Sequence, residues 1–436
     1  MMRLVARSFA HHRASAVATG LVAAAGTALV TAMAGLLGTG LSAVPDDRDF
    51  LVQFPLILGG WVLAIVLFAM ISTIAVALHG RANEIAGIRL IGATPPQIRR
   101  MIAAETAIVA SIAALPGLLG GQLLGVGLLA GIRGADLVDD ATGYAPGAVF
   151  PLIATVLMLG AAVAAAWIGS RTIAARSPVE DPAPARSRGG AGRRIAAGAA
   201  LTAGLASSIA VLTVDADDIM TTALTGPACV LAGVGSGLLA PELIRAAQRV
   251  LARIPALRSG PAGHLVALNL ATAPERIRPA VTFLTLFIGV AAGTLSMQSI
   301  ENGHGADGGD GELMATINYL VVFLIAAFMA IALSNNLIAS IARRHTEFAT
   351  MHLIGATPSQ SRQMLIGEAA TAVTISTVTG AVGAFVTTVP FAIVKTGGPL
   401  AAFAPLPYAV AVVLGACTTV GVTAVAGRRA VRAAAA

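Results

Sequence analysis

Long apolar segments separated by short polar ones run along the whole chain. About ten of the apolar segments are long enough to cross a membrane as a helix, which takes about 20 residues. We predict spans over about Ser15–Leu41, Phe54–Leu78, Ile102–Ile132, Ala148–Ile168, Ile195–Val214, Met220–Ala240, Ala280–Met297, Ala315–Ile341, Leu365–Val394 and Tyr408–Ala426. The pattern therefore predicts an all-α integral membrane protein of about ten transmembrane helices.

One polar segment between two spans occurs twice. Residues 81–101 and residues 344–364 each lie between long apolar runs, and both contain the sequence Leu-Ile-Gly-Ala-Thr-Pro. We call these segments the first and second islands. The other matched pairs are Arg81/Arg344, Glu84/Glu347, Ala86/Ala349, Gln97/Gln360, Arg99/Arg362, Met101/Met364 and, just beyond the islands, Glu105/Glu368. A polar segment retained twice in a hydrophobic chain indicates a duplicated unit whose island contacts something outside the membrane.

Each island is predicted to form two short helices around a bend. In the first island a helix over Arg81–Leu90 should stop at Gly92, because glycine is favoured just past a helix end. Thr94 can then cap the next helix, with Pro95 at its first position. The second island repeats this pattern with Gly355, Thr357 and Pro358. A plain connector between spans is the alternative to a docking surface, and we favour docking because both copies are retained.

Two carboxylates lie about one turn inside their predicted spans. Glu105 and Glu368 hold matching places after the two islands. A carboxylate within a span is costly and is often functional. Both residues are close to the end of a span, so we favour an interfacial structural role and keep transmission of movement as the alternative.

The composition agrees with a membrane protein. Hydrophobic residues make up 56% of the chain and charged residues 11%, whereas a soluble domain carries about 25% charge. The two cysteines, Cys229 and Cys417, lie in apolar runs and give no disulfide framework or zinc site. We expect no metal.

The distribution of charge predicts the topology. With the N-terminus in the cytoplasm, 25 of the 28 basic residues face the cytoplasm and 13 of the 21 acidic residues face outside. This positive-inside bias places both termini and both islands in the cytoplasm. The net charge of +7 is then a topology signal and an attraction to anionic lipids, and we expect no nucleic-acid partner.

The spans group as two four-span units around a central pair. We predict a first repeat over 1–176, a flexible cytoplasmic linker over 177–194, two extra spans over 195–241, a cytoplasmic amphipathic connector over 242–279 and a second repeat over 280–436. An even number of spans separates the repeats, so they run parallel. The connector carries Leu243, Ile244 and Val250 at helical spacing with arginines off that stripe, which suits a helix on the membrane surface.

The island sequence resembles the cytoplasmic signature of FtsX-like permeases, the membrane subunits of MacB-type (type VII) ABC systems. The ten-span plan is similar to the BceB-like branch. The resemblance implies that each island is a coupling helix against an ATPase, and the matching positions are Glu84, Arg89, Gly92, Ala93, Thr94, Glu347, His352, Gly355, Ala356 and Thr357. The second island departs at His352 and Thr350, so the two docking sites are expected to be unequal. The outer segment Ser299–Glu312 is too short for the large extracellular domain of the BceB branch.

The chain has no phosphate-binding Gly-x-x-x-x-Gly-Lys-Ser/Thr sequence, so we expect it to be no enzyme and to hold no cofactor. The resemblance implies a permease of the bacterial cell membrane with two copies of a separate ABC ATPase, which would bind ATP and Mg. It would couple ATP hydrolysis by mechanotransmission to export or extraction of a hydrophobic or amphipathic antibiotic, peptide or lipid. Two alternative functions stay open: a signalling or regulatory protein moved by an ATPase without transport, and an ATP-independent secondary transporter. A small extracellular partner also stays open.

Overall fold

The computed structural model is all-helical and describes residues 13–79, 82–134, 136–175, 190–216, 218–253, 260–304, 309–342 and 344–435. Within these residues ten helices are long and apolar enough to cross a membrane. The chain divides into two compact units, residues 1–189 with 305–328 and residues 190–304 with 329–436. This division groups residues that contact one another and does not test where a sequence repeat begins or ends. The predicted boundaries of the repeats therefore stay a prediction.

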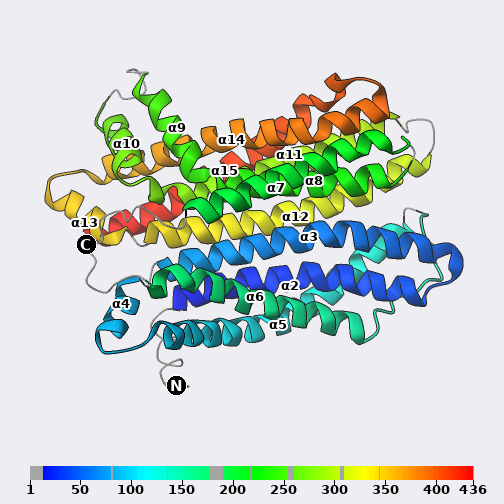
Figure 1. The fold of residues 1–436 in the computed structure, drawn as a ribbon, viewed down its shortest axis with the longest axis horizontal. Helices are drawn as coiled ribbons and strands as arrows, with labels where there is room; N and C mark the ends of the chain where they lie inside the picture. The colour runs from blue at the N-terminus through cyan, green and yellow to red at the C-terminus, as the bar shows by residue number, and fades with distance from the viewer. Residues whose placement is uncertain are drawn as a thin grey trace. The chain divides into compact units, whose positions relative to one another are not determined.

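Unit 1 consists of long helices around α2, with one short helix between the second and third of them (Figure 1). Its helices are α2 (Arg13–Ser42), α3 (Pro45–His79), α4 (Ala82–Leu90), α5 (Pro95–Arg133), α6 (Val149–Ala175) and the first part of α12 (Gly309–Ala342). Small residues let α2 and α5 approach closely. A Cβ added at Gly121 would lie 2.7 Å from the carbonyl oxygen of Ala28, so only glycine fits there.

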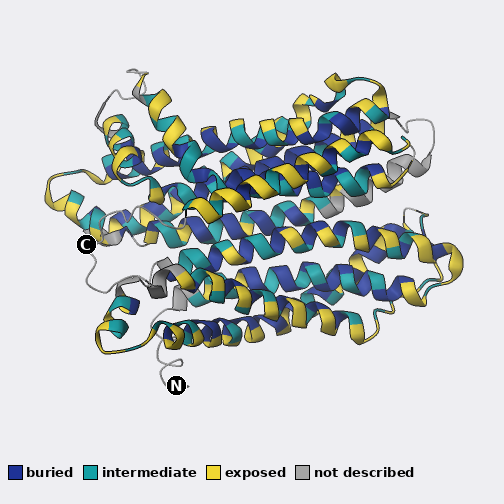
Figure 2. Ribbon diagram, viewed as in Figure 1, coloured by how far each residue is buried: buried dark blue, intermediate teal, exposed yellow. Residues whose placement is uncertain are grey.

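Unit 2 is built around α11, the most buried of the ten candidate spans. Its elements are α7 (Gly190–Ala210), η1 (Val211–Thr213), α8 (Met220–Leu238), α9 (Ala240–Ala252), α10 (Gly260–Thr272), η3 (Pro274–Arg276), α11 (Arg278–His304), the rest of α12, α13 (His345–Leu353), α14 (Pro358–Thr396), η4 (Pro399–Ala402) and α15 (Pro405–Ala435). In Figure 2 the buried residues follow the inner faces of the helices in each unit, and the exposed residues follow the outer faces.

Several helices are longer than the sequence pattern predicts. The polar segment Pro45–Asp49, which the sequence pattern leaves between the first two predicted spans, is the first turn of α3, because proline and early acidic residues favour a helix start. The predicted outer loop from Ser299 is helical to His304, with Gln298 donating to Asn302 one turn later at 2.7 Å. The second helix of each island is not separate, since α5 and α14 run without a break from Pro95 and Pro358 into the spans.

Candidate docking and transmission site

The bend of each island has the same backbone geometry in both copies. Gly92 has φ +99° and Gly355 has φ +92°, a left-handed conformation that favours glycine. The amide of Ala93 donates to Ile88 O at 3.2 Å, and the amide of Ala356 donates to Met351 O at 2.9 Å. The predicted helix ends at Gly92 and Gly355 are therefore confirmed.

The caps of α5 and α14 also match. The Thr94 amide donates to Oε1 of Gln97 at 2.9 Å, and the Thr357 amide donates to Oε1 of Gln360 at the same distance. At Thr357 the hydroxyl also accepts from the Gln360 amide at 3.3 Å, which completes a reciprocal cap. Thr94 and Thr357 both hold the predicted N-cap positions, and the predicted side-chain cap is confirmed at Thr357, so each island holds a fixed turn at the start of a long helix.

An exposed apolar pair lies at the tip of each bend. Leu90 and Ile91 are 66% and 85% exposed, and Leu353 and Ile354 are 85% and 79% exposed. In each pair the leucine is the last residue of a short helix, α4 or α13, and the isoleucine begins the turn, so both pairs lie outside the candidate spans. Exposed apolar side chains grouped on a turn are typical of a protein-binding surface. We did not select these residues from the sequence, although they are the first two of the Leu-Ile-Gly-Ala-Thr-Pro segment present in both copies.

The predicted docking residues differ in accessibility. Those exposed on their islands are Glu84, Gly92, Thr94, His352, Gly355 and Thr357, whereas Arg89, Ala93, Glu347 and Ala356 are half-buried. Nη1 of Arg89 is buried with no hydrogen-bond partner among the described residues. Whether these residues bind an ATPase stays a prediction, but Glu347 points into the protein rather than away from it.

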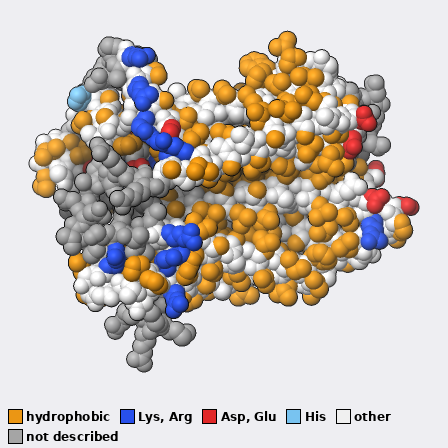
Figure 3. Space-filling view, in the orientation of Figure 1, with side chains coloured by type: hydrophobic (Ala, Val, Ile, Leu, Met, Phe, Trp, Pro, Cys, Tyr) orange, Lys and Arg blue, Asp and Glu red, His pale blue; other side chains and the backbone are white. Residues whose placement is uncertain are grey.

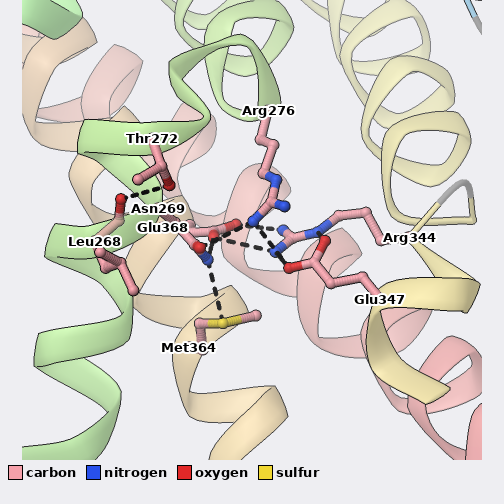
Figure 4. A network of polar contacts seen from close by, with 8 residues as sticks. All are labelled: Leu268, Asn269, Thr272, Arg276, Arg344, Glu347, Met364 and Glu368. Carbon is pink, nitrogen blue, oxygen red and sulfur yellow. Dashed lines mark hydrogen bonds and ion pairs between the residues drawn. The ribbon is translucent and has the colours of Figure 1, made fainter. Parts of the chain in front are cut away.

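Glu347 belongs to a polar network at one end of unit 2 (Figure 4). Its Oε2 lies 3.0 Å from Nε of Arg344, and its Oε1 lies 2.8 Å from Nη1 of Arg276. Arg276 follows α10 in the connector, and Arg344 immediately precedes α13. Glu347 therefore joins the start of the second island to the connector.

Glu368 is the buried centre of the same network. Nη2 of Arg344 lies 3.2 Å from its Oε1, and Nη1 of Arg344 donates to its Oε2. Asn269 of α10 donates to Oε1 at 2.7 Å and in turn accepts from Arg276 at 2.9 Å. Burial alone would lower the pKa of Arg344, but Glu347 and Glu368 raise it above its usual value, so the guanidinium stays ionised.

The network ties three elements of unit 2 together. It links the second island, the first turns of α14 and the connector helix α10. Movement of α13 must therefore shift α14 or break charge-assisted hydrogen bonds. The sequence indicated Glu368 through its position in a span, but no local pattern indicated Asn269 or Arg276.

The first copy has the matching glutamates. Glu105 is buried, Glu84 is exposed, and both have interaction partners within the protein. Arg81, which matches Arg344, lies outside the described residues. The roles of Glu105 and Glu368 in transmission stay a prediction.

The predicted amphipathic connector begins with a helix, α9, that carries an ion cluster. Arg193 at the start of α7 holds Glu242 with both terminal nitrogens, each at 2.7 Å from a carboxylate oxygen. Arg194 and Arg245 approach the same carboxylate at 3.0 and 3.1 Å. The bonds from Arg193 lower the pKa of Glu242 to about 2, against a smaller opposing effect of burial.

Charge is polarised along the helices of each unit. Most of the Lys and Arg side chains visible in Figure 3 lie near the end that carries α4 in unit 1 and α9 in unit 2, and most of the visible Asp and Glu side chains lie at the opposite end. Between the two ends the surface is mainly hydrophobic, as expected of helices that face lipid.

Comparison with known protein families identifies the repeated part of the chain. The profile of the family described as FtsX-like permease C-terminal matches it twice, over residues 56–178 and 319–435. Each match contains one island, and the two together cover more than half of the chain. A search of curated proteins finds no match.

Proposed function

The chain belongs to the FtsX-like permease family, and from this premise we propose that it is the transmembrane permease subunit of an ABC transporter. Members of the family are typically non-catalytic subunits that pair with an ABC ATPase. In this proposal ATP and Mg bind to the partner ATPase, and the chain itself supplies no catalytic residue. It lies in a bacterial cell membrane with its termini and both islands in the cytoplasm.

The observation that carries the proposal is the pair of islands with the same bend and the same exposed tip. Leu90 and Ile91 at one tip, and Leu353 and Ile354 at the other, offer apolar side chains that a partner can bury. Burying one such side chain contributes about 1.5–3 kcal/mol. The two turns share their backbone geometry and each lies at the start of a long helix, which suits a partner made of two identical subunits.

The mechanism is mechanical. Closure of the ATPase dimer moves the islands, and each island continues directly into a span, α5 or α14. On the second island the bonds of Arg344 and Glu347 to Glu368 and Arg276 transmit this movement to α14 and to the connector. The spans then do work on a hydrophobic or amphipathic substrate, exporting it or extracting it from the membrane.

The test is capture of the ATPase. We would co-express the chain with a candidate ABC ATPase from the same genome and change Leu90, Ile91, Leu353 and Ile354 to serine together. Capture should weaken by about 100-fold or more, because several kcal/mol of apolar burial is lost. Val250→Ser removes an exposed apolar side chain from α9 and should leave capture unchanged. Full capture by the quadruple variant would refute the proposal.

A further inference from the structure

A crevice of about 230 Å³ lies between the start of α14 and the last turns of α15, within unit 2. Two arginines border it, Arg362 from α14 and Arg428 from α15. Ser359 and Thr423 contribute hydroxyl groups, and Leu365 and Ile366 contribute apolar side chains. The lining therefore combines two cationic groups with hydroxyl and apolar groups.

The two arginines have no acidic partner within the described residues. Arg362 donates Nε to the carbonyl of Pro358 at 3.2 Å, which fixes its side chain and leaves its terminal nitrogens available. Arg428 is exposed and forms no ion pair in the described part of the chain. Two guanidinium groups at one crevice repel each other, so an anion between them would stabilise the pair.

The hydroxyl of Thr423 supports a ligand at this place. Thr423 is 4% exposed, and its Oγ1 has no hydrogen-bond partner among the described residues. Thr418 and Thr419, one turn earlier on α15, instead donate to carbonyl oxygens of their own helix at 2.8 Å. A buried hydroxyl without a partner is costly, and an oxygen-rich ligand in the crevice would satisfy it.

The first repeat shows a different arrangement around the matching arginine. Arg99 matches Arg362, and its guanidinium carbon lies 4.0 Å from the ring centroid of Trp167 on α6. Its Nη2 also donates to the carbonyl of Trp167 at 3.5 Å. Helix α15 has no tryptophan, and its one aromatic residue, Tyr408, lies in its first turn. An indole therefore covers the arginine in the first copy, while an open crevice borders it in the second.

The sequence pattern predicts that the crevice lies at the depth of lipid headgroups. The apolar run of α14 begins at Leu365, and that of α15 ends at Ala426, so we expect Arg362 and Arg428 just outside the hydrocarbon core. The positive end of the helix dipole at the start of α14 also favours an anion there. We propose that this crevice binds the phosphate of an anionic phospholipid, with Arg362, Arg428 and Thr423 as ligands and an acyl chain along Leu365 and Ile366.

The experiment uses the full-length chain without an ATPase, so it does not depend on the proposed function. We would titrate detergent-purified protein with phosphatidylglycerol, and separately with inorganic phosphate, and count bound molecules by native mass spectrometry. The variant R362Q/R428Q should bind phosphatidylglycerol at least about tenfold more weakly, because charge-assisted hydrogen bonds to phosphate are lost. Thr423→Val should weaken binding by a smaller factor.

Two further variants distinguish a specific site from non-specific electrostatic attraction between the basic protein surface and the anionic lipid. R249Q/R253Q removes the same charge from two exposed positions, one in α9 and one directly after it, and should leave phosphatidylglycerol binding unchanged. Ala424→Trp keeps every charge but fills the crevice, as Trp167 covers Arg99 in the first copy, and should abolish binding. Equal loss in R249Q/R253Q and R362Q/R428Q, or full binding by Ala424→Trp, would overturn the proposal. Saturable binding of inorganic phosphate without binding of phosphatidylglycerol would show that the crevice takes free phosphate and not a phospholipid, and would overturn the proposal.

Discussion

Arg344 and Glu368 form an ion pair across the bend of the second island, with Nη2 of Arg344 3.2 Å from Oε1 of Glu368. Both side chains are more than nine-tenths buried. The pair lies where the island joins α14, so it couples the position of α13 to that of the span. The same glutamate holds Asn269, which extends the coupling to the connector.

Removing one partner of this pair should destabilise the protein strongly. Glu368→Ala leaves Arg344 buried without its second carboxylate, which should lower the free energy of unfolding by about 3–5 kcal/mol. The double variant R344M/E368L should cost less, because no buried charge remains unpaired. Glu275→Gln breaks the exposed pair with Arg278 and should cost less than about 1 kcal/mol. We would measure unfolding in detergent; a double variant less stable than Glu368→Ala would contradict the pair's role.

Alanine variants of three island glycines should separate two contributions to stability, backbone strain at positive φ and helix propensity. Gly92→Ala and Gly355→Ala place a Cβ at positive φ and should each cost about 1–2 kcal/mol. No atom lies within 4 Å of the added Cβ, so the cost would come from the backbone alone. Gly87→Ala lies inside α4 and should stabilise by up to about 1 kcal/mol. We would compare melting temperatures; equal shifts for the three variants would exclude a requirement for glycine at the bend.

Local features of the islands could be predicted because their causes are local. A glycine after a helix and a threonine before a proline determine an end and a cap within a few residues, as at Gly92 and Thr94. Glu368 could be selected because a carboxylate within an apolar run is costly. The start of α3 could not be predicted in this way, because Pro45 with its neighbouring aspartates favours both a turn and a helix start, and the structure shows the helix.

The partners of Glu368 could not be predicted in the same way. Asn269 is 99 residues away in the sequence, and Arg276 reaches Glu347 over 71 residues. One sequence contains no signal for contacts at such separations. The exposed Leu-Ile pairs also required the structure, because the sequence does not show whether apolar residues of a cytoplasmic segment pack against their own helices or, as here, stay exposed.

The ion cluster at Glu242 should make stability depend on pH. Since the pKa of Glu242 falls from its usual 4.5 to about 2 on folding, its contribution is complete above about pH 4.5 and is lost as the pH falls towards 2. Wild-type protein should melt above Glu242→Gln at pH 6, and this difference should shrink between pH 4.5 and 2. Arg193→Gln should weaken the dependence, because Arg193 is its main cause. A difference in melting temperature that stays constant down to pH 2 would exclude this assignment.

Thiol labelling in intact cells should fix the topology. In a background without Cys229 and Cys417, cysteines at Asp49 and Asp140 should react with an impermeant reagent, and a cysteine at Thr346 should not. All three positions are exposed. Asp47 is a poor site, because it is buried and accepts from the amide of Asp139 at 3.2 Å. Labelling at Thr346 but not at Asp49 would reverse the orientation and place the second island on the wrong side for an ATPase.

The number of islands predicts the stoichiometry of the complex. A permease with one island must dimerise to offer two docking turns, but this chain already has turns at Gly92 and Gly355 with the same hydrogen bonds. The repeats are predicted to be parallel, so both turns face one side and one chain should serve two ATPase subunits. The contacts should be unequal, because the planar guanidinium of Arg89 offers more hydrogen-bond donors than the imidazole of His352, which takes its place in the second copy. Light scattering of the purified complex should give one permease per ATPase dimer, and a mass larger by a further 43.5 kDa would show two copies and refute this model.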